Sequence, residues 1–126
     1  MRIGDLAKAA GVTARTVRYY ESIGLLPPGE REGAGQHHYT DQAVARLRKI
    51  DQLKTLGLSL DEIRSVIVVY FIDPSGRQPK SKVLAILRRH LAETDGKIAA
   101  LKAFRAELRA HIERFERWFE TEENHD

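Results

Sequence analysis

The sequence of 126 residues contains no cysteine. Disulfide bonds, thiolate metal sites, cysteine nucleophiles and thiol-based redox sensing are therefore all excluded. No apolar run approaches the ~18 residues that a membrane-spanning helix needs. The first residues, MRIGDLAKAAG, also lack the apolar stretch of a secretory signal. These absences predict a cytoplasmic protein.

Features of an enzyme are also missing. The sequence shows no Ser/His/Asp set, no paired carboxylates in a catalytic setting and no phosphate-cradling loop. Gly33 and Gly35 do not form such a loop, because no strand precedes them and no helix begins there. His90, His111 and His125 are the candidate metal ligands, but along one helix His90 and His111 would lie about 31 Å apart, so one site could hold both only if an antiparallel partner brought them together. We therefore expect no enzymatic activity, no cofactor and no metal.

The basic charge is confined to one half of the chain. Residues 1–56 contain nine Lys and Arg against six Asp and Glu, whereas residues 57–126 contain twelve of each. A local excess of positive charge suits a surface that contacts phosphates, because binding releases counterions condensed on nucleic acid. An ordinary solvated surface is the other interpretation of so small an excess.

The first quarter of the chain carries a helix-turn-helix signature. Residues 3–10 place apolar side chains at helical spacing, and Gly11 ends that helix. Thr13 is a good N-cap for a second helix over residues 14–23, which Gly24 ends. Two short helices joined by a glycine-containing turn are typical of this motif.

The next segments alternate between loop and helix. Residues 27–38 are rich in Pro and Gly and are expected to form a loop or a short β-hairpin. A third helix is predicted over residues 41–56, with Thr40 as its cap and apolar residues every three positions from Val44 to Leu56. Ser59 and Glu62 form a capping box for a fourth helix ending near residue 71. These elements complete a first domain over residues 1–72.

The rest of the chain is predicted to be one long helix. We expect a linker over residues 73–79, the helix over residues 80–120 and a frayed tail over residues 121–126. Eleven positions alternate by three and four residues, and nine of them are apolar against 42% for the whole chain. These positions are Leu84, Leu87, Leu91, Thr94, Ile98, Leu101, Arg105, Leu108, Ile112, Phe115 and Phe119.

The seam formed by these positions needs a partner. It is too long for a domain of about 72 residues to cover by folding back, and the chain offers no second helix of that length. We therefore expect a homodimer, in which the nine apolar seam residues pack in an antiparallel coiled coil. The fold class is mainly α, with a winged helix-turn-helix domain followed by a dimerising helix.

Two stretches resemble the MerR family of transcriptional regulators. They are IGDLAKAAGVTARTVRYYESIGLLPP, with its RYYE motif, and YTDQAVARLRKIDQLKTLGLSLDEIRSVI, with LGLSLDEI. The resemblance covers residues 2–72 closely, and the long helix only in layout. It implies a winged reading head that binds double-stranded, pseudo-palindromic promoter DNA.

In this motif the start of the second helix enters the major groove. Arg15 can donate two hydrogen bonds to a guanine, and we expect the other contacts to position the protein on the backbone. Glu21 is expected to orient Arg18 or the helix end, and Tyr20 to fill the core. The candidate DNA-binding residues are Arg2, Thr13, Arg15, Thr16, Arg18, Tyr19, His37, His38, Tyr39 and Lys54.

The wing departs from the family pattern. His37 stands where the family has an Arg that contacts phosphate, and it supplies charge only near or below about pH 6.5. Tyr39 and Lys54 match family positions that touch the DNA backbone. The wing contact is therefore expected to be weak.

The resemblance further implies a dimer that distorts an overlong promoter spacer so that RNA polymerase can engage both promoter elements. The effector is unknown: Tyr70, Phe71, Lys80 and Trp118 are candidates for a binding site, with core packing and a solvated lysine as the alternatives. A DNA-architecture protein, such as a recombination-directionality factor, is the alternative function. The operator sequence and the sign of regulation do not follow from the sequence.

Overall fold

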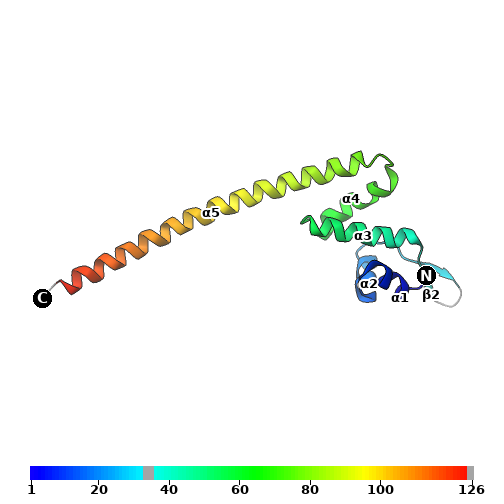
Figure 1. Ribbon diagram of the computed structural model, residues 1–126, viewed down its shortest axis with the longest axis horizontal. Helices are drawn as coiled ribbons and strands as arrows, with labels where there is room; N and C mark the ends of the chain where they lie inside the picture. The colour runs from blue at the N-terminus through cyan, green and yellow to red at the C-terminus, as the bar shows by residue number, and fades with distance from the viewer. Residues whose placement is uncertain (33–35, 125–126) are drawn as a thin grey trace. The chain divides into compact units, whose positions relative to one another are not determined.

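The computed structural model describes residues 1–32 and 36–124, and its elements follow the predicted order (Figure 1). They are α1 (Ile3–Ala10), α2 (Ala14–Ser22), β1 (Glu30–Glu32), β2 (Gln36–His38), α3 (Asp41–Thr55), α4 (Leu60–Ile72) and α5 (Arg77–Glu123). The mainly helical class is confirmed. Gly33 and Gly35 of the predicted wing and His125 of the predicted tail lie outside the described residues. No helix in the described part of the chain is long and apolar enough to cross a membrane.

The chain divides into two compact units, and the contacts between residues are concentrated within each unit. The first, which we call the head, comprises Met1–Leu87 and contains α1 to α4, the wing and the start of α5. The second, which we call the distal helix, is the remainder of α5 from Arg88 onward.

The helix-turn-helix of the head forms as predicted. Gly11 ends α1 in the left-handed conformation, with φ 72°, which glycine adopts without steric cost. Thr13 caps α2, and its Oγ1 accepts the backbone N–H of Thr16 at 3.1 Å. The two helices contribute Leu6 and Val17 to the core, both fully buried.

The central helix of the head is α3, which packs against both α1 and α4. Four of its predicted apolar residues, from Val44 to Leu53, are buried. The prediction that Leu56 shares their face is wrong, because this side chain is 53% exposed. A step of three residues falls short of the 3.6-residue turn, so the successive side chains rotate away from the core.

The wing is a two-stranded antiparallel hairpin, which decides between the two predicted alternatives. Arg31 of β1 lies opposite His37 of β2, and Glu30 lies opposite His38. The short strands therefore place successive histidines on opposite faces of the hairpin.

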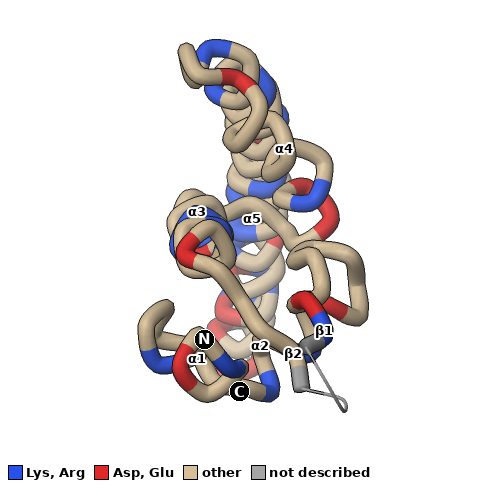
Figure 2. Tube along the Cα trace, turned by 90° about the vertical axis from the view of Figure 1, so that its right-hand side faces the viewer, with Lys and Arg blue, Asp and Glu red and all other residues tan. Residues whose placement is uncertain are grey.

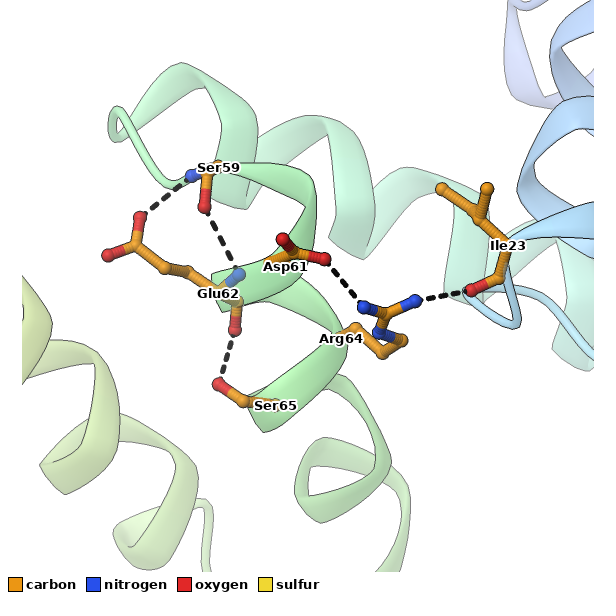
Figure 3. A network of polar contacts seen from close by, with 6 residues as sticks. All are labelled: Ile23, Ser59, Asp61, Glu62, Arg64 and Ser65. Carbon is orange, nitrogen blue, oxygen red and sulfur yellow. Dashed lines mark hydrogen bonds and ion pairs between the residues drawn. The ribbon is translucent and has the colours of Figure 1, made fainter.

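The predicted capping box begins α4 (Figure 3). Ser59 Oγ accepts the backbone N–H of Glu62 at 3.2 Å, and the Glu62 carboxylate accepts the N–H of Ser59 at 2.9 Å. Two of the backbone N–H groups that lack a partner within the helix are thereby satisfied. Ile63 and Ile67 then enter the core.

The turn after α4 is organised by Asp73. Its carboxylate accepts the backbone N–H of Gln78 at 2.9 Å and that of Ser75 at 3.0 Å. These hydrogen bonds, with that from Gln78 the largest cause, lower the pKa of Asp73. These hydrogen bonds fix the backbone after Asp73, so α5 begins at Arg77 and not at the predicted Lys80.

The expected linker over residues 73–79 is therefore too long, since residues 77–79 are helical. Pro79 fits in the first turn of α5, where a backbone N–H would have no partner within the helix, and it is buried. Val83 and Ile86 then complete the core of the head, and Leu87, which was assigned to the seam, packs partly against the same cluster.

The distal helix is almost entirely exposed in the single chain. From residue 88 to residue 124 only His90 is partly buried. The large apolar side chains of this segment are 45–67% exposed. The helix also continues to Glu123, beyond the predicted end at residue 120.

We predict that Ser59→Ala lowers the free energy of unfolding by about 1 kcal/mol, because two N–H groups at the start of α4 lose their capping arrangement. Ser65→Ala is the control: this hydroxyl only donates to the Glu62 carbonyl at 2.6 Å within the helix, so its loss should change stability by less than about 0.5 kcal/mol. Urea denaturation measures both. Equal losses would contradict the assignment.

Candidate nucleic-acid interface

The first turn of α2 presents polar side chains to solvent. The Thr13 hydroxyl donates to Thr16 Oγ1 at 3.0 Å, so the two threonines hold each other in place. Arg15 lies between them and is exposed. Within the described part of the chain its guanidinium has no hydrogen-bond or ion-pair partner. This turn therefore offers an extended cation with all five donors available.

The remainder of α2 joins this turn to the end of α3. Arg18 is exposed, and Tyr19 is half-exposed with its ring 6.1 Å from that of Tyr20. Tyr20 is buried, as predicted, and its hydroxyl accepts a hydrogen bond from Lys54 Nζ at 3.4 Å. The ammonium group of Lys54 is thereby held beside α2, which agrees with its expected place on the same surface.

The predicted role of Glu21 needs correction. Its carboxylate does not orient Arg18 but accepts a short hydrogen bond from the hydroxyl of Tyr39. Tyr39 follows β2, so this bond ties the base of the wing to α2. A charge-assisted bond of this kind is stronger than one between neutral groups.

The geometry also disfavours the predicted phosphate contact of Tyr39. Its side chain is 6% exposed, and the single hydrogen of its hydroxyl is already donated to Glu21. Burial, followed by the hydrogen bond and the charge of Glu21, raises the pKa of Tyr39 to about 12, against a smaller opposing effect of the Arg18 charge. Tyr39 thus positions the wing.

The base of the wing is closely packed around Gly29. A Cβ at this position would lie 2.9 Å from the Tyr39 ring and from the His38 carbonyl, so no side chain fits. The Gly29 carbonyl accepts a hydrogen bond at 2.9 Å from His37 Nδ1, which must therefore carry a proton. When the ring is neutral, Nε2 is then an acceptor and cannot donate to a phosphate.

Arg2 is also brought to the wing. The backbone N–H of Tyr39 donates to the Met1 carbonyl at 2.7 Å, which lays the segment before α1 along the end of the hairpin. Arg2 follows directly and is exposed. Its backbone N–H donates to the Asp5 carboxylate at 3.2 Å, so its side chain projects from a fixed point.

Other arginines of the head are bound to carbonyl groups at helix ends. Arg48 donates to the Ala9 carbonyl at 3.3 Å, and Arg64 donates to the Ile23 carbonyl at 2.7 Å. Arg64 also pairs with Asp61 at 2.5 Å (Figure 3). A cation near the C-terminal end of a helix is favourable because that end carries partial negative charge. Neither contact follows from a local sequence pattern, because the two partners lie 39 and 41 residues apart.

The candidate effector residues Tyr70 and Phe71 pack inside the head. Lys49 Nζ lies 4.5 Å from the centre of the Tyr70 ring, and the guanidinium of Arg46 lies 5.7 Å from that of Phe71. Arg46 also donates to the Leu25 carbonyl at 3.2 Å. Both rings are partly buried against the core, and burial raises the pKa of Tyr70. These aromatic rings therefore fasten α4 to the cations of α3.

The other effector candidates lie in different units. Lys80 is exposed in the first turn of α5, in the head. Trp118 lies in the distal helix, where its ring contacts that of Phe119 edge-on at 4.9 Å. No group of three His, Cys, Asp or Glu residues suited to a metal ion occurs in the described part of the chain.

The contacts thus divide the cations of the head into two groups. Lys and Arg residues occur on α1, α2 and α3 (Figure 2). The helix on which a cation lies therefore does not decide whether the cation is bound within the head or remains available. Arg48 and Arg64 donate to carbonyls at helix ends, and Arg46 donates to the Leu25 carbonyl after α2, whereas Arg15 and Arg18 remain available on α2. The surface formed by α2, the wing and the end of α3 can therefore bind a polyanion and read base edges.

Two protein-family models match the chain. The model described as MerR HTH family regulatory protein matches residues 1–67. The model described as MerR, DNA binding matches residues 44–111. The two matches together cover the head and most of the distal helix.

Individual relatives agree with these models. The HTH-type transcriptional regulator ZntR homolog of Haemophilus influenzae is 34% identical over 86% of this chain and 78% of its own length. The HTH-type transcriptional regulator HmrR of Sinorhizobium medicae is 34% identical over 81% of this chain and 67% of its own. An uncharacterized HTH-type transcriptional regulator of Pseudomonas aeruginosa is 34% identical over 90% and 83%.

Solved structures show the same fold. The transcription regulator PbrR691 from Ralstonia metallidurans, in complex with lead(II), has a TM-score of 0.68 and 33% identity over 86% of this chain and 82% of that chain. HiNmlR, a MerR family regulator lacking the sensor domain and bound to promoter DNA, has a TM-score of 0.55 and 26% identity over 82% and 76%.

We predict that the stability of the protein falls between about pH 10 and pH 12 because of Tyr39. The folded state keeps the phenol protonated up to about pH 12, whereas the unfolded chain releases this proton near pH 10, so the contribution is complete below pH 10 and is lost above it. It amounts to at most about 3 kcal/mol. Tyr39→Phe should lack this part of the decline in thermal denaturation, whereas Tyr19→Phe, which removes an exposed phenol, should retain it.

Proposed function

Because this chain belongs to the MerR family of helix-turn-helix regulators, we propose that two copies of it bind one promoter duplex and control transcription by deforming it. The observation that carries the proposal is the state of Arg15 and Arg18. Both are exposed on α2, while other arginines of the head are bound to helix ends. A regulator that reads DNA needs hydrogen-bond donors at the DNA groove that are not already bound within the protein.

Arg15 is the proposed reader of sequence. It lies in the first turn of α2, the part of such a helix that meets base edges in the major groove, and it can donate two hydrogen bonds to a guanine. Thr13 and Thr16 flank it and can reach the adjacent backbone or bases. A fixed, capped helix start keeps this arginine in one register on the duplex.

The remaining contacts are proposed to position the head on phosphates. Arg18 and Tyr19 lie on the outer side of α2, Lys54 lies beside Tyr20, and Arg2 lies beside the wing. His37 and His38 are the proposed wing contacts; a neutral His37 has no N–H left for a phosphate, so its contribution requires a protonated ring. These groups give affinity without sequence preference.

The dimer is proposed to form through the distal helix. Its apolar residues are 45–67% exposed in the single chain, and an antiparallel second copy would cover them. Two heads on one rod would grip two half-sites of a pseudo-palindrome, and bending and untwisting the DNA between them would bring promoter elements into reach of RNA polymerase. The energy for this deformation comes from phosphate contacts at both half-sites.

The relatives bear on the alternatives. The relatives named above are described as transcriptional regulators, and this supports promoter control over recombination or catalysis. PbrR691 is described in complex with lead(II). The present sequence has no cysteine, so any effector is bound without thiolate ligands.

Footprinting on the DNA beside the gene for this protein tests the proposal. We expect protection of a palindrome inside a promoter spacer. On that site, Arg15→Ala should lose about 1–3 kcal/mol of discrimination at the base pair it reads. Arg18→Ala should weaken binding to all sequences equally and lower the slope of affinity against salt concentration by about one.

Arg48→Ala is the matched control, because its guanidinium is held at the end of α1. It should leave both discrimination and the salt slope close to those of the unaltered protein. Equal affinity of the unaltered protein for every duplex would contradict the proposal.

We predict that His37→Arg tightens DNA binding several-fold at pH 7.5. The neutral His37 uses Nδ1–H on Gly29 and offers no donor to DNA, whereas arginine supplies a permanent charge and raises the salt slope by about one. Fluorescence anisotropy titrations at three salt concentrations measure both effects. No gain at any of them would show that the wing does not contact the backbone.

A further inference from the structure

Two polar residues interrupt the apolar seam of the distal helix. Thr94 and Arg105 stand where the neighbouring seam residues are apolar, and both are exposed in the single chain. The hydroxyl of Thr94 donates its hydrogen to the His90 carbonyl at 2.8 Å, which leaves its oxygen able to accept. In the described part of the chain the Arg105 guanidinium has no such acceptor.

We propose that Arg105 of each copy packs against Thr94 and Asp95 of the other copy, and that this polar layer sets the direction and register of the coiled coil. The inference rests on the dimer of the proposed function and adds the pairing that selects one alignment of the two helices.

In a coiled coil a seam residue of one helix enters a hole formed by four residues of the facing helix. In an antiparallel pair with Arg105 opposite the partner's Thr94, this hole consists of Leu91, Thr94, Asp95 and Ile98. It contains a carboxylate and a hydroxyl oxygen among two apolar side chains. The guanidinium would therefore meet two acceptors at the point where it is withdrawn from water.

The same alignment pairs the seam residues from Leu84 to Phe115 with one another, whereas Phe119 would face the partner's Lys80. Leu91 faces the partner's Leu108, and Ile98 faces the partner's Leu101. At the ends, Leu84 faces the partner's Phe115. The two polar residues thus share one layer, which occurs twice because of the two-fold symmetry.

Other alignments place like charges together. A shift of one heptad toward the C-terminus surrounds Arg105 with the partner's Ile98, Leu101, Lys102 and Arg105. The opposite shift surrounds it with Leu84, Leu87, Arg88 and Leu91 of the partner. In a parallel pair Arg105 faces its own copy. A buried arginine beside another cation is strongly unfavourable.

The absence of native cysteine allows a direct measurement of the alignment. A spin label on Glu113→Cys puts one probe on each chain of the full-length protein. At 1.5 Å per residue, the proposed register separates the two labels by about 40 Å along the rod. The heptad shift toward the C-terminus gives about 30 Å, and a parallel pair leaves them less than about 20 Å apart.

A charge exchange tests the pairing itself. Arg105→Glu alone places a carboxylate beside the partner's Asp95, and Asp95→Arg alone places two arginines together. Each should raise the dimer dissociation constant by at least about tenfold, and the double variant should return it to within about threefold of the original. Arg117→Glu, on the side of the helix away from the seam, is the control and should have little effect.

The results of these experiments distinguish a failure of the proposed dimer from a failure of the proposed register. A chain that sediments as a monomer at micromolar concentration overturns the dimer and the proposed function with it. A dimer whose labels lie about 30 Å or about 50 Å apart overturns only the register, because these are the distances for a shift of one heptad in either direction. Labels that lie close together overturn the antiparallel direction as well. Failure of the double variant to recover dimerisation overturns the contact between Arg105 and Asp95.

Discussion

The head can cover only the first part of α5, and this limit determines the rest of the molecule. Val83 and Ile86 complete the core of the head, and beyond Leu87 the large apolar side chains are half-exposed or more. Full burial of each such side chain is worth about 1.5–3 kcal/mol. A second copy is the simplest source of that burial, and in the proposed function it would bring two heads to one duplex.

Within the head, backbone carbonyls and carboxylates decide which cations remain available. Arg48 and Arg64 end on the last carbonyls of α1 and α2 and so hold the helix-turn-helix against α3 and α4. The wing is joined to α2 by the hydrogen bond between Tyr39 and Glu21, so the Glu21 carboxylate is bound to the wing and Arg18 stays exposed. The fold thus uses some cations to hold its own helices and leaves others exposed on the surface of α2.

Local signals in the sequence predicted the elements well, because each depends on neighbouring residues. The threonine cap of α2 and the capping box of α4 are read from spacings of three residues, and the structure has both. Contacts between distant segments could not be read in this way. Tyr39 matched a phosphate-contacting position by resemblance, yet its partner Glu21 lies 18 residues earlier. The start of α5 was missed because Pro79 suggested a linker, although a proline is compatible with the first helical turn.

The polar layer proposed for the coil links its internal packing to the DNA that the heads can reach. A slip of one heptad moves each helix by about 10 Å along its partner, since each residue advances 1.5 Å. The two heads would then be displaced by the length of about three base pairs, or nearly a third of a helical turn of DNA. Such a displacement turns one reading helix away from its groove. A seam of leucines alone would tolerate this slip, because successive heptads present nearly equivalent surfaces. An arginine that finds a carboxylate in only one alignment therefore exchanges some stability of the rod for a fixed distance between the heads, and a regulator that deforms a spacer of set length depends on that distance.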